Sequence, residues 1–512
     1  MLVCPAHSVN LLDLSLGTTR FKRFRHFKSI CLMSVILLTL IVHCLCTCLI
    51  GTCLASPFEL YGVGSKGSAL ANTGSASASD YSAVYYNPAA LLNSKSSLGM
   101  GLSYTFKDLE VKLSPRPMGY NIPDLGASSP AVPSAFELRT RSGQTQATHS
   151  FTMITGLSSN LGTQNLRVGF LLSLPVYHSI DSYPSRFADE RERLFSNQVS
   201  FSLLGGRVEH FVAQVAAAYQ LGDWLAVGIG ASVAPEAFTR NFIYMNDAAR
   251  QDEVDLNIGL QTSTRWRLNA GLLVTPNQRF KLGMNYRDEQ YMVIRGLNEV
   301  QVRGLQGSDS YPFEQSLYII TDYSPRQFTY ALNYLSQNQD HSLSLDLVYT
   351  LWSDYLDAHG EEVDFTDIWS PRLAYEYQML NGQAARFGIQ WSPSPIPEQD
   401  GRSNYVDNDR LVLSVGSGHE IEIQGKSLSL SWHIQFHGLV GRSHQKTLKT
   451  DYELCQSDTQ SLCDEVDDNL TDPNTQTPYP EAQGLQTGNP GFPGYSHGGL
   501  IIQTGVEVTW RF

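Results

Sequence analysis

The chain has few charged residues, and only one segment of it is strongly apolar. Charged side chains make up 17% of its 512 residues, and the mean hydropathy is −0.19, which is too polar for a bundle of membrane helices. A transmembrane β-barrel is still possible, because its hydrophobic residues alternate with polar ones and do not form long runs. Composition therefore leaves a soluble multidomain protein or a barrel.

Cysteine is scarce outside the N-terminus. Six of the eight cysteines precede residue 56, which leaves Cys455 and Cys463 close together in one polar segment. This spacing suits a single disulfide in an oxidising compartment. A zinc site would need more ligands than the segment offers, so no metal site and no cofactor are expected.

Residues 1–55 are typical of a secretory signal peptide. A basic run from Arg20 to Lys28 precedes the apolar stretch Ile30 to Ala55, and small residues at its end suit cleavage after Ala55. An uncleaved membrane anchor is the alternative, since the stretch is long enough to span a bilayer. Removal of the segment leaves 31 basic and 48 acidic residues, a net charge of −17 that does not favour nucleic acid as a partner.

Strict alternation of apolar and polar residues is the main structural signal. Between Lys426 and His437, Leu428, Leu430, Trp432, Ile434 and Phe436 alternate with serine, histidine and glutamine. The pattern recurs in about fourteen segments: 98–113, 150–159, 166–176, 207–220, 224–244, 254–275, 279–298, 316–335, 341–356, 366–380, 384–393, 409–422, 426–441 and 499–512. The sequence thus predicts an all-β fold, a transmembrane antiparallel β-barrel spanning residues 98–512.

The connections between these segments alternate in length. Tight links at 221–223, 276–278, 336–339, 381–383 and 424–425 alternate with long ones, which include 114–148, 177–206, 395–408 and 442–498. An outer-membrane barrel has short periplasmic turns on one rim and long extracellular loops on the other. The bacterial outer membrane is therefore the expected location.

Charged residues within the segments are predicted to face the lumen. The inward set is Arg267, Lys281, Arg287, Asp346, Arg372, Glu376, Arg386 and Glu507. A charge facing lipid near the midplane costs roughly 2–4 kcal/mol, which explains the one-sided distribution. Its five cations, Arg267, Lys281, Arg287, Arg372 and Arg386, are candidates for binding a ligand carboxylate, although some must pair with lumen carboxylates.

Residues 56–97 do not fit the strand pattern. They are small and polar, and they are predicted to form a plug inside the lumen; a disordered periplasmic tail is the alternative. Gly62 to Gly67 match a dinucleotide-binding glycine pattern but follow no strand, so a tight turn is favoured.

Ser431, His433 and His437 share an inward face and are interpreted as lumen lining, not as catalytic residues.

The segment Phe58 to Leu92 closely resembles the N-terminal hatch of the FadL family of outer-membrane transporters. Asn87-Pro88-Ala89 is that family's most specific signature, and Tyr219–Gly230, Leu347–Ser353 and Arg386–Gly416 resemble the family in the same order. The resemblance implies a fourteen-stranded barrel with a hatch, ligand binding or gating at Phe58, Asn87, Pro88 and Ala89, and exit through an opening in the barrel wall.

Passive uptake of long-chain fatty acids or other hydrophobic compounds is therefore the leading hypothesis for function. A general diffusion porin and a barrel-embedded lipid hydrolase are the alternatives. The expected partners are a hydrophobic small molecule, outer-membrane lipid and lipopolysaccharide, and the expected state is a monomer.

Overall fold

The computed structural model describes residues 58–114, 142–144, 147–178, 186–187, 212–233, 237–243, 254–264, 266–302, 313–357, 360–379, 382–400, 403–423, 426–447, 465–466, 486–487 and 494–512. The expected signal peptide at 1–55, the expected disulfide Cys455–Cys463, and most of loops 114–148, 177–206 and 442–498 lie outside these residues.

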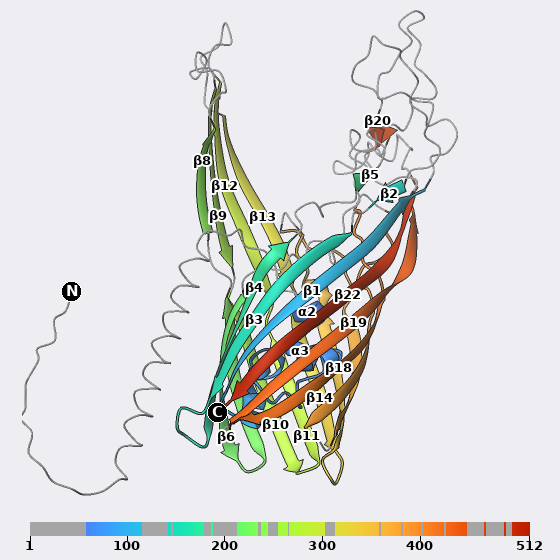
Figure 1. Ribbon diagram of the computed structural model, residues 1–512. Helices are drawn as coiled ribbons and strands as arrows, with labels where there is room; N and C mark the ends of the chain where they lie inside the picture. Colours follow the sequence, from blue (N-terminus) through green and yellow to red (C-terminus); the bar gives the residue numbers. More distant parts are fainter. Residues whose placement is uncertain are drawn as a thin grey trace, which may run out of the picture. The chain divides into compact units, whose positions relative to one another are not determined.

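Fourteen of the described strands form one closed antiparallel barrel (Figure 1). They are β1 (Ser97–Leu113), β3 (Thr148–Ser159), β4 (Leu166–His178), β6 (Val212–Gly222), β7 (Leu225–Val233), β10 (Arg267–Asn277), β11 (Phe280–Arg287), β14 (Arg326–Leu335), β15 (His341–Leu351), β16 (Ile368–Gln378), β17 (Gln383–Ser392), β18 (Arg410–Ile423), β19 (Lys426–Gln445) and β22 (Gly494–Arg511). Pairing of β22 with β1 closes the barrel. The predicted fold class is confirmed.

Four segments that alternation predicted as single strands are each split in two. β8 (Ala237–Ile243), β9 (Val254–Thr264), β12 (Gln290–Val302) and β13 (Phe313–Ser324) form a separate sheet in the order β13-β12-β9-β8. This order matches the order β14-β11-β10-β7 in the barrel, so each strand extends a barrel strand. Pro325 separates β13 from β14 and has no N–H to continue a ladder, a break that a period of two does not reveal.

Four short strands belong to the connections. β2 (Ser142–Gln144) pairs with β1 and with β5 (Arg186–Phe187), and β20 (Glu465–Val466) pairs with β21 (Gln486–Thr487). The 3-10 helix η6 (Trp352–Asp354) follows β15.

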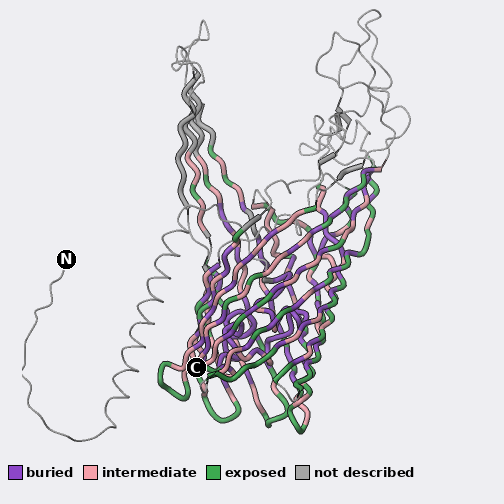
Figure 2. Tube along the Cα trace, viewed as in Figure 1, coloured by how far each residue is buried: buried purple, intermediate pink, exposed green. Residues whose placement is uncertain are grey.

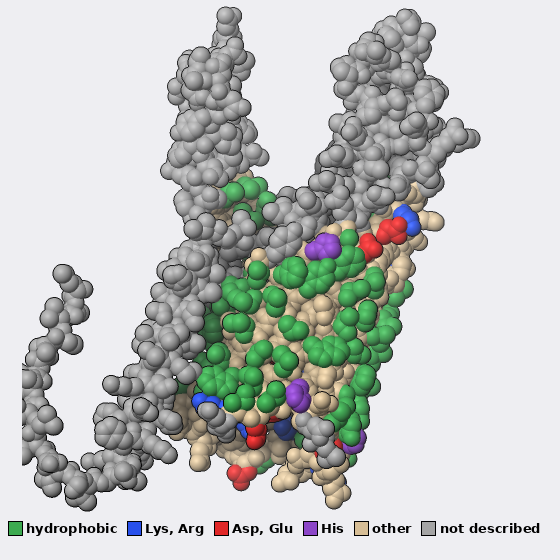
Figure 3. All heavy atoms as spheres, viewed as in Figure 1, with side chains coloured by type: hydrophobic (Ala, Val, Ile, Leu, Met, Phe, Trp, Pro, Cys, Tyr) green, Lys and Arg blue, Asp and Glu red, His purple; other side chains and the backbone are tan. Residues whose placement is uncertain are grey.

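Buried and exposed residues alternate along the barrel strands (Figure 2). On β15, Leu343 and Leu345 are 45% and 44% exposed, whereas the intervening Ser344 is 4% exposed. Hydrophobic side chains cover the outer wall, and charged side chains gather near its ends (Figure 3). Such an apolar belt matches a bilayer. Among the described residues, no helix combines the length and hydrophobicity required to cross a membrane.

Four short helices lie inside the barrel: α2 (Phe58–Tyr61), α3 (Gly64–Ala69), α4 (Ala83–Tyr86) and the 3-10 helix η2 (Pro88–Asn93) (Figure 1). α3 contacts β17, β18, β19 and β22, and η2 contacts β4, β6, β7 and β10 on the other side. Asn87 caps η2, because its Oδ1 accepts a hydrogen bond from the Ala89 N–H at 3.0 Å, and Pro88 occupies the first turn. We call the described residues before β1, 58–96, the plug.

Inward-facing glycines let the plug approach the wall closely. Gly99 of β1 and Gly156 of β3 are partners in the ladder, and a Cβ on either would collide with the ring of Tyr81. Gly228 and Gly271 are likewise partners, and a Cβ there would overlap the chain between Asn87 and Ala89. At these four glycines, therefore, the wall and the plug leave no room for added atoms.

A methyl group added at this contact is expected to destabilise the barrel. Gly156→Ala places a Cβ within the Tyr81 ring, and overpacking costs typically about 1–3 kcal/mol. We expect a lower urea midpoint in refolded protein. Gly222→Ala is the matched control, since nothing lies within 4 Å of a Cβ there. Equal midpoints for the two variants would contradict the close fit.

Candidate functional site

Charged and polar side chains of the wall hold the plug through its backbone. Asp346 Oδ2 accepts hydrogen bonds from the N–H groups of Gly74 and Ser75, both at 3.1 Å. Arg372 donates to the carbonyl of Asn72 at 2.9 Å. Glu507 accepts a hydrogen bond from the Ser65 N–H. These bonds satisfy backbone groups at the start of α3 and in the segment that follows it.

The five predicted carboxylate-binding cations lie at different places around the plug. Arg386 is paired with Glu376, with 2.7 Å from Nε to Oε2, and Glu376 also lies 3.4 Å from the Lys66 ammonium. Lys281 donates to the side chain of Asn93 at 2.8 Å. These two cations therefore have partners within the protein.

The other three cations are Arg267, Arg287 and Arg372. Arg287 donates to the carbonyl of Tyr85 at 2.7 Å and stacks on its ring, with 3.9 Å from Cζ to the centroid. Arg267 forms an ion pair with Glu59 of the plug at 2.8 Å. Each of these three arginines both contacts the plug and lines a cavity.

The first of these cavities lies between the plug and the loop 393–409, and we call it the mouth cavity. Its empty volume is about 540 Å³. The polar part of its lining includes Glu59, Gln327, Arg372, Gln390 and Arg410. Arg372 Nε and Gln390 Oε1 are buried and have no hydrogen-bond partner among the described residues. The mouth cavity thus offers a cationic and incompletely bonded surface.

Arg410 is a cavity residue that sequence reasoning missed. It is the first residue of β18 and is 7% exposed. It lies within the predicted segment 409–422, and alternation there could have added it to the inward set, because Leu411 and Leu413 face outward at 39% and 49% exposure. Residue 410 must then face inward.

Aromatic side chains pack beside the mouth cavity. Trp352 and Ile368 line the cavity and belong to a cluster with Phe365, Tyr355 and Tyr405. Phe365 stacks on Tyr355 with 4.7 Å between ring centroids and meets Tyr405 edge-on at 5.1 Å. The cavity therefore joins a polar floor to an apolar, aromatic side.

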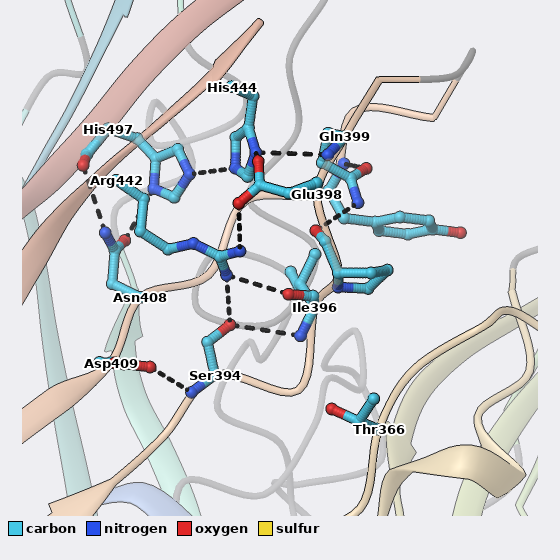
Figure 4. Close-up of polar contacts among 12 residues, drawn as sticks. Thr366, Ser394, Ile396, Glu398, Gln399, Asn408, Asp409, Arg442, His444 and His497 are labelled. Atoms are coloured by element: carbon cyan, nitrogen blue, oxygen red, sulfur yellow. Dashed lines mark hydrogen bonds and ion pairs between the residues drawn. The ribbon is translucent and has the colours of Figure 1, made fainter.

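The loop between β17 and β18 folds over the mouth cavity and is fixed to β19 and β22 (Figure 4). Glu398 Oε2 lies 2.9 Å from His444 Nδ1, and His444 Nε2 lies 3.0 Å from His497 Nε2. His497 Nδ1 in turn lies 2.9 Å from Asn408 Oδ1. Arg442 donates to the carbonyl of Ile396 at 3.0 Å. Both ends of the loop are thus anchored.

A second cavity lies against the wall, and we call it the wall cavity. It is small, with room for about one water, and its polar lining is Gln214, Ser232, Arg267, Asn269 and Arg287. A third cavity of about 610 Å³ lies at the end with the short connections, where Lys66, Lys281 and Glu376 line it.

Three of the four residues assigned by resemblance lie outside the linings of these cavities. Asn87, Pro88 and Ala89 pack against Gly228 and Gly271, and none of them lines any of the three cavities. Asn87 also donates to the carbonyls of Ser75 and Leu272, at 2.7 and 3.1 Å, which joins the plug to β10. Phe58 begins α2, and its side chain lies outside the described residues.

The polar residues of β19 do not form a nucleophile and base pair. Ser431 accepts a hydrogen bond from Arg386 at 3.3 Å, whereas His433 contacts Gln503 and His437 contacts Gln435, at 2.7 and 3.0 Å. Within the described ranges, no three metal-ligating side chains come together.

Comparisons with known proteins agree with the fold. The family described as outer membrane protein transport protein (OMPP1/FadL/TodX) matches residues 194–450, half of the chain. Alkane uptake protein A of Marinobacter nauticus is 22% identical over 367 residues, which cover 65% of this chain and 72% of that protein.

Solved structures show the same architecture. A Pseudomonas aeruginosa FadL homologue superposes with a TM-score of 0.55 at 14% identity, over 88% of this chain and 98% of the homologue. The deltaS2 mutant of the TodX monoaromatic hydrocarbon channel superposes with a TM-score of 0.50 at 13% identity, over 89% of this chain and 100% of the mutant.

Acid is expected to loosen the loop over the mouth cavity. The hydrogen bond with His444 holds the pKa of the Glu398 carboxyl below its ordinary value. The ionised Glu398 carboxylate therefore stabilises the closed loop. This stabilisation is fully present above the ordinary pKa of a glutamate and is lost as the pH falls through the lowered pKa of Glu398. We expect Glu398→Gln to speed hydrogen exchange of residues 393–400 relative to wild type at pH 7 but not in strong acid. Glu422→Gln, at an exposed site on β18, is the control; a difference that persists in acid would refute the role of this carboxylate.

Proposed function

Since the chain belongs to the outer membrane protein transport family (OMPP1/FadL/TodX), we propose that it takes up long-chain fatty acids and binds their carboxylate in the mouth cavity. It is an outer-membrane transporter of hydrophobic compounds and not an enzyme, because the members of this family are transport channels.

The polar floor of the mouth cavity supports a ligand with a charged head. Arg372 Nε and Gln390 Oε1 have no partner among the described residues, and Arg410 lines the same cavity. A hydrocarbon bound there would leave the buried Nε–H of Arg372 without an acceptor, at about 1–3 kcal/mol for such a group. A carboxylate accepts short, charge-assisted hydrogen bonds from guanidinium groups. The lining therefore favours a fatty acid over a neutral hydrocarbon of equal length.

The aromatic side of the cavity suits the acyl chain. Trp352 and Ile368 connect the cavity to the cluster around Phe365 and Tyr405. We propose that the carboxylate faces the plug while the chain lies along these rings, since burial of apolar area contributes roughly 25 cal/mol for each Å².

Neutral hydrocarbons are the second candidate substrate. The curated relative named Alkane uptake protein A favours it. An alkane would contact the aromatic cluster, as an acyl chain would, but it would make no use of Arg372. The two candidates therefore differ in their dependence on that residue.

Several expectations remain proposals. The close fit of plug and wall at Gly156 and Gly228 supports a closed barrel over a general diffusion porin. Exit through the wall, contact with lipopolysaccharide and a monomeric state stay predictions. A gating role for Phe58, Asn87, Pro88 and Ala89 is proposed through the attachment of the plug to β10.

Removal of the Arg372 charge should separate the two substrates. Arg372→Gln is expected to weaken binding of a long-chain fatty acid about 10- to 100-fold, the usual value of one charged hydrogen bond. Binding of an alkane of equal carbon number should not change. Titration calorimetry of purified protein would give both affinities, and Arg279→Gln, an exposed residue between β10 and β11, is the control. Equal losses for acid and alkane, or none for the acid, would contradict the proposed head-group site.

A further inference from the structure

The ion pair between Glu59 and Arg267 is the only one between the described part of the plug and β10. It joins α2 to the wall at 2.8 Å, and the two side chains are 4% and 3% exposed. The remaining contacts of Arg267 are with the wall: Nε donates to the carbonyl of Asp288 at 2.6 Å, and Nη2 also approaches that of Pro325 at 3.4 Å. The wall thus fixes the guanidinium, and the plug supplies its anion.

This ion pair lies between two cavities. Glu59 lines the mouth cavity, whereas Arg267 lines the wall cavity. A second polar contact has the same arrangement, because Arg287 of the wall cavity donates to Gln327 of the mouth cavity at 3.0 Å. Two polar contacts, Glu59 with Arg267 and Gln327 with Arg287, thus connect the lining of the mouth cavity to that of the wall cavity.

The wall cavity has unused hydrogen-bonding capacity. Gln214 Oε1, Ser232 Oγ and Asn269 Oδ1 are buried and without partners among the described residues. With Arg267 and Arg287 they line the wall cavity. The Ser232 hydroxyl and the Gln214 amide can donate to an anion once their orientation adjusts, whereas the Asn269 amide already donates to the carbonyl of Val84 at 3.1 Å. The cavity has room for about one water, so a carboxylate reaches these guanidinium groups only in the place that Glu59 now takes.

We propose that Arg267 and Arg287 form a second carboxylate-binding site, which Glu59 of the plug occupies at rest and the carboxylate of the transported acid takes over. The inference rests on the proposed function, since it requires a ligand with a carboxylate. Glu59 and a fatty acid present the same chemical group to Arg267, so their exchange preserves the charge of a buried site. A neutral head cannot make this exchange, because Arg267 would remain buried without a counter-charge.

The exchange would make the attachment of the plug to the wall depend on the head group of the ligand. Once Glu59 leaves Arg267, α2 loses its described ion pair with the wall, and the boundary between the two cavities opens on the plug side. A fatty acid would therefore loosen α2, whereas a fatty alcohol of equal length would occupy the mouth cavity without this effect.

Hydrogen exchange of the wild-type protein tests the coupling directly. Exchange of residues 58–61 is expected to become at least threefold faster with a saturating long-chain fatty acid than with the matching alcohol. Equal rates with the two ligands would overturn the proposal. This measurement needs no variant and does not depend on a substituted plug that folds.

Substitution of the internal carboxylate tests the competition. Glu59→Gln removes the competing charge and is expected to raise fatty-acid affinity at least 10-fold, with no change for the alcohol. Asp346→Asn is the control, because it weakens another attachment of the plug without touching Arg267. An equal gain in Asp346→Asn would show general loosening and would refute competition at Arg267, as would an unchanged affinity in Glu59→Gln.

Failure of this inference is distinguishable from failure of the proposed function. If wild type binds fatty acid through Arg372 but neither Glu59→Gln nor the exchange of residues 58–61 responds, only the second site is refuted. If no variant binds fatty acid while alkanes bind, the proposed substrate is wrong and this inference is refuted with it.

Discussion

The structure depends on hydrogen bonds between lumen-facing side chains of the barrel and the backbone of the plug. The plug helices are four to six residues long, so most of their N–H and C=O groups have no partner within a helix. Gln435 of the wall donates to the carbonyl of Ser68 in α3, and Asp346 and Arg372 bond Gly74 and Asn72 in the segment after this helix. The bilayer requires apolar residues on the outside of each strand, and alternation then leaves these polar residues on the inside.

The same side chains give the lumen its chemistry. Arg372 holds the plug at Asn72 and lines the mouth cavity, and Arg267 holds Glu59 and lines the wall cavity. A ligand that takes a hydrogen bond from either arginine therefore changes the attachment of the plug. The same residues can therefore serve ligand binding and gating in such a barrel, because the arginines that bind the head group also hold the plug.

The loop between β17 and β18 shows how tertiary contacts change the meaning of a sequence segment. Its length alone predicted an extracellular loop over 395–408. In the structure Ile396 and Val406 are 4% and 0% exposed, and the loop forms part of the mouth cavity. His444 and His497 of the barrel hold it there. Their spacing in the chain gave no sign of this, since Glu398, His444 and His497 are far apart in sequence.

The sequence by itself determined the barrel, its outer-membrane location and the inward direction of Arg267, Arg372 and Glu376. Alternation of apolar and polar residues is a local property of each strand, and the cost of a lipid-facing charge depends on its depth in the membrane. It did not separate β12 from β11, since the two residues between these strands leave the alternation unchanged. It also grouped five cations that the structure separates into different pairs and cavities, and it missed Arg410. Partners such as Glu59 and Arg267 are 208 residues apart, and only closure of the barrel around the plug brings them within hydrogen-bond distance.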